Sequence, residues 1–159
     1  MEDTEGASGQ QPARLRQTPT WLITQTATLT HRLVSMALAA VGATRYHYAV
    51  LSALDEFGST SQAELGRRCH IDRSDMVAAI NDLTASLFVE RRQDPSDRRQ
   101  NLITLTDSGK RRLEQIASVL DGVQDDLLGP LGQNERDSLA TTLRRILDHR
   151  AGELDEPRG

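Results

Sequence analysis

Two groups of side chains in this sequence have the types and spacing needed to contact the edges of DNA bases. The first group shares one face of a helix predicted to begin after Asp72, and it consists of Arg73, Ser74, Val77, Ala78 and Asn81. The second group is Arg98 and Arg99, which follow a turn sequence. Arginine and asparagine carry donors that match guanine and adenine edges. A face that only meets solvent would usually carry Glu and Lys, so this face favours close approach to double-stranded DNA.

Two short capped helices are predicted to position the first group. Ser61, followed three residues later by Glu64, has the pattern of a capping box. Asp72 is a capping residue for the second helix, and Ile71 and Met76 occupy the two positions of a hydrophobic staple. The inward face of the second helix is predicted to consist of Met76, Ile80, Leu83 and Leu87. This pattern indicates a helix-turn-helix.

A β-hairpin is predicted to present the two arginines, by pairing residues 88–93 with residues 100–106. The segment Asp94-Pro95-Ser96-Asp97 has strong turn chemistry, because proline presets the turn and both aspartates can bond the backbone. A basic hairpin tip on its own serves solubility as often as nucleic-acid binding. Its place directly after a helix-turn-helix favours the second role.

Longer helices are predicted on both sides of this unit, in residues 18–43 and 107–149. They carry apolar stripes at helical spacing, which a small DNA-binding unit cannot cover by itself. Packing within one subunit is one explanation, and exchange of helices between two chains is the one we favour. Residues 1–17 are polar and are predicted to be a disordered arm, and residues 150–159 a flexible tail.

Length, charge and composition limit the remaining classes of fold and function. The chain has 159 residues, enough for one domain with a core, and its net charge is −4. Residues 60–112 carry ten Lys or Arg against eight Asp or Glu, whereas residues 113–159 carry five against ten. The predicted DNA-binding segment is therefore the most basic third. No signal peptide and no apolar run near 18 residues is visible, which predicts a cytoplasmic protein without a membrane partner.

Enzymatic, metal and redox roles find little support. The run Gly6-Ala7-Ser8-Gly9 falls short of a nucleophile elbow because Gln10 follows it, so no enzyme and no cofactor is predicted. The histidines are scattered and match no zinc site: His31, His47, His70 and His149. Cys69 lies between Arg68 and His70, a setting that could lower its pKa and allow redox sensing, although a small buried residue is the favoured interpretation.

The combined motifs resemble the MarR family of winged-helix transcriptional regulators. Asp97 and Arg99 form D-x-R, five residues separate Arg99 from Leu105-Thr106, and S-G follows shortly after. Upstream stand QAELGRR, the IDRS cap and LFVERR. The resemblance covers roughly residues 20–148. It implies a mainly α fold with a small β-hairpin wing: four helices, two strands and two helices, with residues 44–106 as the DNA-binding domain.

The resemblance also implies how the protein would act. Helices one, five and six would form the interface of a homodimer, which would bind a pseudo-palindromic operator, usually as a repressor. Arg99 would enter the minor groove, with Asp97 orienting an arginine near it and Arg98 helping with phosphates. The helix face described above would meet bases and backbone, while Gln62 and the N–H groups near Ser61 would take a phosphate.

Two acidic residues depart from a strongly basic binder. Asp75 is predicted to interact with the dipole of its helix, and Asp82 to pair with a nearby arginine. The resemblance further implies a small aromatic effector, for which the candidates are Trp21, His31, Arg45, Tyr46, His47 and Tyr48. The alternative, which we favour, is that the aromatic residues belong to the core and His47 caps or pairs near a helix start.

A winged helix used only for protein association is the competing function. Such a module would expose aromatic or aliphatic anchors at the wing tip and on the outer helix face. Here those positions carry Arg, Ser and Asn, which favours DNA.

Overall fold

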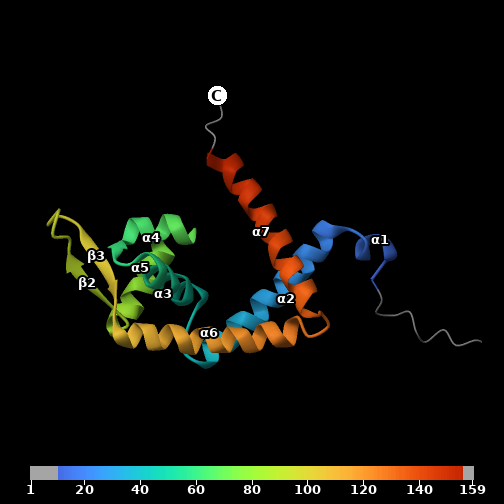
Figure 1. The fold of residues 1–159 in the computed structure, drawn as a ribbon, viewed down its shortest axis with the longest axis horizontal. Coiled ribbons are helices and arrows are strands. Elements are labelled where there is room, and N and C mark those ends of the chain that lie inside the picture. Colours follow the sequence, from blue (N-terminus) through green and yellow to red (C-terminus); the bar gives the residue numbers. More distant parts are fainter. Residues whose placement is uncertain (1–10, 156–159) are drawn as a thin grey trace, which may run out of the picture. The chain divides into compact units, whose positions relative to one another are not determined.

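The computed structural model describes residues 11–155, and their side chains as far as residue 149. In chain order the elements are α1 (Ala13–Arg16), α2 (Pro19–Ala40), α3 (Arg45–Phe57), β1 (Thr60–Ser61), α4 (Gln62–Cys69), α5 (Arg73–Ala85), β2 (Val89–Gln93), β3 (Asn101–Leu105), α6 (Asp107–Leu127) and α7 (Gln133–Asp155) (Figure 1). The predicted fold class, mainly helical with a hairpin wing, is confirmed.

The helix-turn-helix consists of α4 and α5, and its caps fix where both helices begin. Ser61 Oγ accepts a hydrogen bond from the Glu64 N–H at 3.2 Å. The Glu64 carboxylate turns instead to Arg67 and Arg68, so only half of the predicted capping box forms. His70 ends α4 with φ 51°, a left-handed conformation that turns the chain sharply toward α5.

The β-sheet has three strands in the order β1-β3-β2, and all its pairs are antiparallel. β2 and β3 form the predicted hairpin, with Val89 opposite Leu105 and Gln93 opposite Asn101. β1 adds a third strand on the other side of β3, where Thr60 lies opposite Ile103. We did not predict it from sequence, because a two-residue strand has no alternation to detect.

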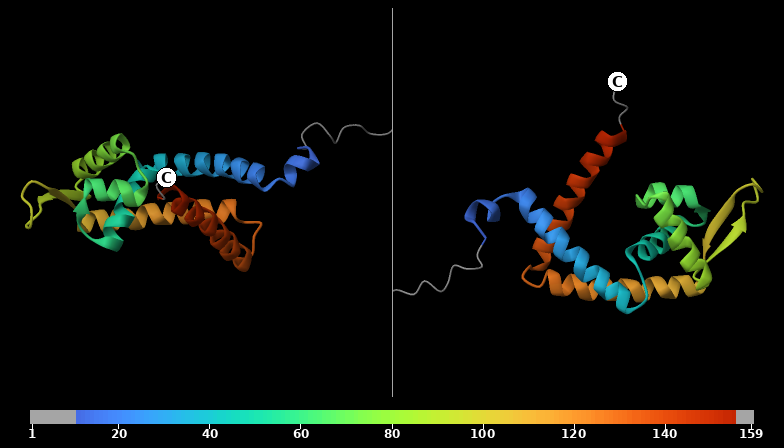
Figure 2. Two further views of the ribbon diagram at one scale, coloured as in Figure 1. Left: turned by 90° about the horizontal axis from the view of Figure 1, so that it is seen from above. Right: turned by 180° about the vertical axis from the view of Figure 1, so that it is seen from behind.

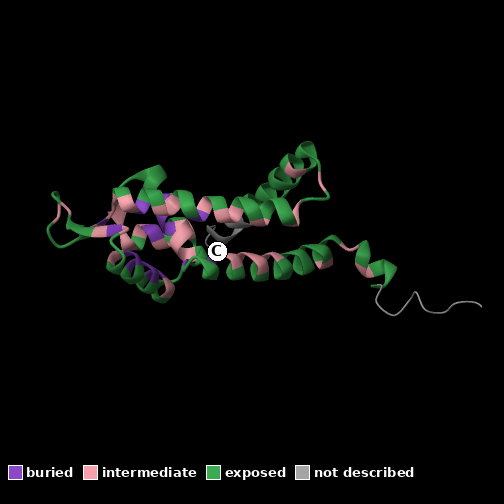
Figure 3. Ribbon diagram, turned by 90° about the horizontal axis from the view of Figure 1, so that it is seen from below, coloured by how far each residue is buried: buried purple, intermediate pink, exposed green. Residues whose placement is uncertain are grey.

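The core lies among α3, α4, α5 and the sheet, where the buried parts of the ribbon gather (Figure 3). Leu38 of α2 and Ile116 of α6 also belong to it. Met76, Ile80 and Leu83 are at most 2% exposed, as predicted. The prediction for Leu87 was wrong, because this side chain is 73% exposed. α5 ends at Ala85, and Leu87 takes a left-handed φ of 60° in the turn that leads to β2. The helical period therefore no longer applies there.

The chain divides into two compact units, residues 1–120 and 121–159. Within the second unit, Arg136 donates to Asp125 at 2.8 Å and to the Leu131 carbonyl at 3.3 Å, which ties the start of α7 to the end of α6. α7 continues to Asp155, so residues 150–155 of the predicted tail are helical. The run Ala-Gly-Glu-Leu-Asp contains good helix formers, which allows the helix to extend.

The predicted arm also contains structure. Ala13–Arg16 form the short helix α1, since alanine, leucine and arginine favour helix after Pro12. The Trp21 indole donates to the Gln11 side chain at 3.2 Å, which links this segment to α2. Residues 1–10 of the predicted arm lie outside the described residues.

Candidate nucleic-acid interface

The outer face of α5, meaning Arg73, Ser74, Val77, Ala78 and Asn81, is exposed along its whole length. Val77 is 38% exposed, whereas Ile80, one turn farther along and on the inward face, is fully buried. The inward staple and core residues thus fix which face of the helix points outward. The structure brings the five predicted residues together on this face.

The first turn of α5 is held by the carboxylate of Asp72. Its Oδ1 accepts from the N–H groups of Asp75, at 3.0 Å, and Ser74, at 2.9 Å, and from the Ser74 hydroxyl at 2.8 Å. These hydrogen bonds lower the pKa of Asp72, and the one from the Asp75 N–H has the largest effect. The carboxylate is therefore charged at neutral pH. The Ser74 hydroxyl donates within the cap, which leaves its oxygen free to act as an acceptor.

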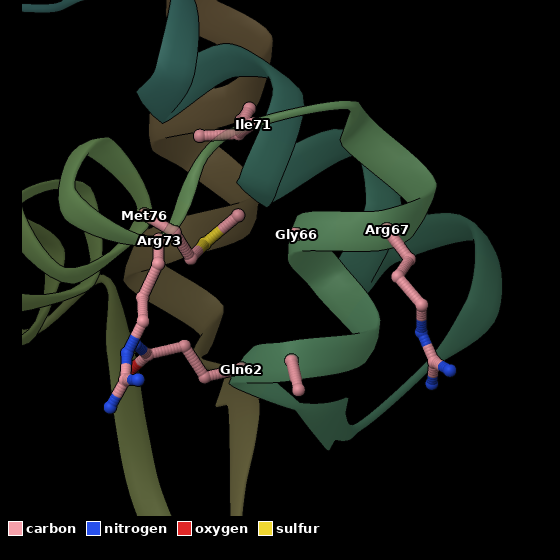
Figure 4. Close-up of a pocket in the computed structure, with 7 residues that line it drawn as sticks. Gln62, Gly66, Arg67, Ile71, Arg73 and Met76 are labelled. Carbon is pink, nitrogen blue, oxygen red and sulfur yellow. The ribbon is translucent and has the colours of Figure 1, made fainter.

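A groove of about 580 Å³ separates α4 from α5 (Figure 4). Its lining consists of Gln62, Ala63, Gly66, Arg67, Ile71, Arg73 and Met76. Gln62 from α4 and Arg73 from α5 approach each other at one edge, and Arg67 lies at the other edge and points away (Figure 4). Sequence reasoning identified the first two but missed Arg67, because its spacing from Glu64 indicates only an ion pair along the helix.

The wing turn is held by its two aspartates. Asp94 Oδ1 accepts from the Ser96 N–H at 2.8 Å and from its hydroxyl at 2.6 Å. Asp97 Oδ1 accepts from the Arg99 N–H at 3.0 Å. Asp97 thus holds the backbone of Arg99, and its orientation of an arginine side chain stays a prediction. The side chains of Arg98 and Arg99 are exposed.

The base of the wing is joined to α5 by a contact that sequence reasoning missed. A guanidinium N–H of Arg91, on β2, donates to Asn81 Oδ1 at 2.7 Å. In both views of Figure 2 the hairpin lies beside α5. Strand alternation was the available signal, because Arg91 shares its face of the sheet with the buried Val89 and therefore faces the helix.

Asp82 pairs with a histidine, so the prediction of an arginine partner was wrong. His47 Nε2 lies 3.5 Å from Asp82 Oδ2. His47 Nδ1 accepts from the Thr44 N–H at 3.2 Å, as part of the cap of α3, so the neutral ring carries its proton on Nε2 and points it at Asp82. Burial lowers the pKa of His47 and outweighs the opposing effect of Asp82. The contact is therefore a weak hydrogen bond from a neutral ring at pH 7.

His47 and Asp82 line a hollow of about 300 Å³ at the end of α5. Its other lining residues are Gly42, Leu83, Ala85, Ser86, Phe88 and Arg112. The guanidinium of Arg112 lies 5.6 Å from the centre of the Phe88 ring, and it also donates to the Val41 carbonyl. The hollow thus joins a cation, a neutral imidazole and an aromatic wall beside the last turn of α5.

The predicted effector residues do not share the lining of this hollow. Of the six, His47 lines this hollow, and the other five are not part of its lining. Tyr46 and Tyr48 pack against the core, and the Arg45 guanidinium lies 4.7 Å from the centre of the Tyr46 ring. Trp21 and His31 belong to α2. This arrangement supports the packing role of Tyr46 and the capping role of His47.

The surroundings of Cys69 and the placement of possible metal ligands bear on the redox and metal alternatives. The Cys69 thiol lies 3.6 Å from the Ala49 carbonyl, and its burial raises its pKa despite the opposing charge of Arg68. The lowered pKa that the sequence suggested was therefore wrong. Within residues 11–149 no group of three His, Cys, Asp or Glu side chains is placed to hold a metal ion. None of the helices in the described part of the chain is long and apolar enough to cross a membrane.

Known proteins resemble this chain in sequence and in fold. A family model described as the MarR family matches residues 41–100. The transcriptional repressor NicR of Pseudomonas putida is 30% identical over 105 residues, which are 66% of each chain. The uncharacterised regulator YxaD of Bacillus subtilis is 37% identical over 64% of this chain and 71% of its own length. The match therefore spans about two thirds of these relatives.

The fold likeness extends further. The repressor CouR, solved bound to a 23-mer DNA duplex, superposes with a TM-score of 0.77 and 26% identity, over 88% of this chain and 99% of its own. These relatives are transcriptional regulators, and so they confirm the expectation that the chain is not an enzyme. The protein belongs to the MarR family of winged helix-turn-helix transcriptional regulators.

Proposed function

We propose that the protein binds a specific sequence in double-stranded DNA, with α5 in the major groove and the wing in an adjacent minor groove. The observation that carries this proposal is the outer face of α5, which is free of large side chains other than Arg73 and lies beside a hairpin whose tip exposes Arg98 and Arg99. Such a surface can approach base edges closely while two arginines add positive charge.

Each side chain of the interface then has a suitable partner. Val77 and Ala78 offer methyl groups to thymine, and Arg73 and Asn81 offer donors to base edges. Gln62, at the start of α4, and the N–H groups after Ser61 suit a phosphate. Arg67, across the groove from Arg73, adds a second cation for the DNA backbone.

We further propose that the protein acts as a homodimer. α7 exposes four apolar side chains at spacings of four, three and one residues: Leu139, Leu143, Ile146 and Leu147, between 37% and 69% exposed. α2 likewise exposes Leu22, Ile23, Leu29 and Met36, between 40% and 66%. Stripes of this kind are covered when a second copy packs on them. A two-fold dimer would read a pseudo-palindrome with half-sites about 34–36 Å apart.

Repression, and release by a small aromatic ligand, complete the proposal. NicR and CouR are named as repressors, and a dimer seated on a promoter would exclude polymerase. The hollow beside α5 supplies an aromatic wall, Phe88, and a cation, Arg112. A small aromatic acid entering there would compete with the contact between His47 and Asp82 and would shift the last turn of α5.

A titration of labelled duplex from the region upstream of the coding sequence tests the DNA-binding proposal. Arg99→Ala is expected to weaken binding by about 1–3 kcal/mol while the oligomeric state in sedimentation stays unchanged. Arg14→Ala, which removes one positive charge from α1, is the matched control and should bind as the wild type does. Equal affinity of Arg99→Ala and wild type would remove the wing from the interface.

A further inference from the structure

The contact between Arg91 and Asn81 determines how the Asn81 amide is oriented. Arg91 carries only donors, so the atom that faces it at 2.7 Å must be the amide oxygen. The Asn81 NH₂ group, with two donors, is then left to point elsewhere on the outer face of α5. Both side chains are exposed, which leaves them accessible to a ligand.

This orientation changes what Asn81 can recognise. A free asparagine reads adenine with both ends of its amide, since the oxygen accepts from N6 while the nitrogen donates to N7. Here the oxygen already accepts from a guanidinium, whose positive charge also repels the amino hydrogens of adenine. The group of Asn81 that remains for the base is its NH₂, which carries two donors. Guanine, which presents two acceptors, O6 and N7, is the matching base.

We propose that Arg91 is a positioning residue for Asn81, and that the pair selects guanine at the base pair facing this point of α5. The inference rests on the proposed function, since it requires α5 to lie in the major groove. A purely structural role for the contact is the competing explanation. Arg91 would then brace the wing against α5, and its loss would weaken binding equally on all sequences.

Selection from a random-sequence duplex library separates these explanations. Wild type is expected to enrich a two-fold motif with guanine at one symmetric pair of positions. Asn81→Ala should lose that preference by about tenfold, with the remaining positions retained. Arg91→Met, which keeps the length of the side chain but no donor, should change the preferred base at the same positions from guanine to adenine, because it frees the amide oxygen.

Control variants and a double-mutant cycle complete the test. Arg92→Ala removes the neighbouring arginine of β2, which pairs with Glu90, and should leave the motif unchanged. Arg91→Lys keeps a charged donor and should retain part of the guanine preference. On the selected duplex, the variant lacking both side chains should bind no more weakly than Asn81→Ala alone. Circular dichroism and thermal unfolding verify that each variant is folded.

Three outcomes would overturn the proposal. Adenine at the position affected by Asn81→Ala in the wild-type motif would show that the amide is not held by Arg91. A motif unchanged in Arg91→Met, with weaker binding throughout, would show that the contact only braces the wing. Failure of the wild type to enrich any sequence would overturn the proposed function together with this inference, so the two failures are distinguishable.

Discussion

The winged helix, from α3 to β3, and the long helices α2 and α7 distribute their apolar side chains in opposite ways. In the winged helix Leu51 and Ile80 are fully buried. In α2, by contrast, Leu38 is its one buried residue, and Met36 is 66% exposed. In α7 none of the described side chains is buried. The first region is stabilised by its own core, whereas the second exposes the apolar side chains on which the proposed dimer rests.

The difference explains why the chain carries two kinds of exposed face. The outer face of α5 is exposed and polar or small, as expected of a surface that meets DNA. The α7 stripe is exposed and aliphatic, as expected of a surface that meets protein. Exposure alone therefore does not identify an interface, and the chemistry of the exposed side chains separates the two.

The largest expected effect comes from truncating the core of the first region. Leu51→Ala should lower the free energy of unfolding by about 2–5 kcal/mol, because it removes a buried side chain and leaves a cavity. Leu147→Ala is the matched truncation in the second region, where the side chain is 69% exposed. At protein concentrations low enough to keep the chains apart, it should change stability by less than about 0.5 kcal/mol. Denaturant titration measures both, and equal losses would contradict the contrast.

The second prediction concerns the partner surface itself. Leu143→Glu places a charge in the middle of the α7 stripe and should weaken self-association by on the order of 3 kcal/mol, because the charge would be buried without a partner. Sedimentation measures the loss of the dimer, and circular dichroism should show the helices unchanged. Ser138→Glu, on the same helix but outside the stripe, is the control. A dimer that survives Leu143→Glu unchanged would place the interface elsewhere.

Two glycines of α6 provide a further test of the comparison. Gly109 lies in the first turn of the helix, beside the wing, and Gly122 lies farther along it. A Cβ at Gly109 would lie 2.0 Å from the Phe88 carbonyl oxygen, whereas a Cβ at Gly122 would have no neighbour within 4 Å. Gly109→Ala should therefore destabilise the fold by about 1–3 kcal/mol through overpacking. Gly122→Ala should stabilise it by about 0.5–1 kcal/mol, since alanine favours helix. Thermal unfolding of both variants provides the measurement. The same sign for both would mean that the close contact at Gly109 is absent.

The smallest expected effect is a pH dependence from His47. Burial, against the opposing influence of Asp82, lowers the pKa of His47 in the folded chain below that of the unfolded chain, which is about 6.5. The unfolded chain therefore takes up the proton first. The contribution of the neutral His47 ring to the free energy of unfolding is fully present above pH 6.5. It is lost as the pH falls through the pKa of the folded chain.

His47→Gln should flatten this loss, by less than about 1 kcal/mol, because Asp82 offsets part of the effect of burial on the His47 pKa. Glutamine can still serve the cap of α3. His31→Gln, on an exposed position of α2, is the control. Unfolding curves measured between pH 7.5 and 5.5 test this prediction. The same dependence of the unfolding free energy on pH in wild type and His47→Gln would contradict it.

Local chemistry accounts for what the sequence could predict. The Asp72 cap and the aspartate hydrogen bonds of the wing depend on residues a few positions apart, and the structure contains both. Ile71 and Met76, at the two staple positions, are both buried. Predictions became wrong where the chain turned or where distant elements met. Leu87 left the helical period by taking a left-handed conformation. The partners of Asp82 and Asn81, which are His47 and Arg91, come from other elements. Strand alternation indicates only that Arg91 faces the helix and does not identify Asn81, and no local pattern indicates His47.

Hydroxyl-radical footprinting of the wild-type protein on its selected duplex tests the central proposal most directly. Two protected patches related by two-fold symmetry, with centres about 34–36 Å apart, are predicted for a dimer that places α5 in successive major grooves. In the footprint of Arg99→Ala, the outer, minor-groove part of each patch should lose its protection. A single patch, or protection that does not depend on the sequence of the duplex, would contradict the account.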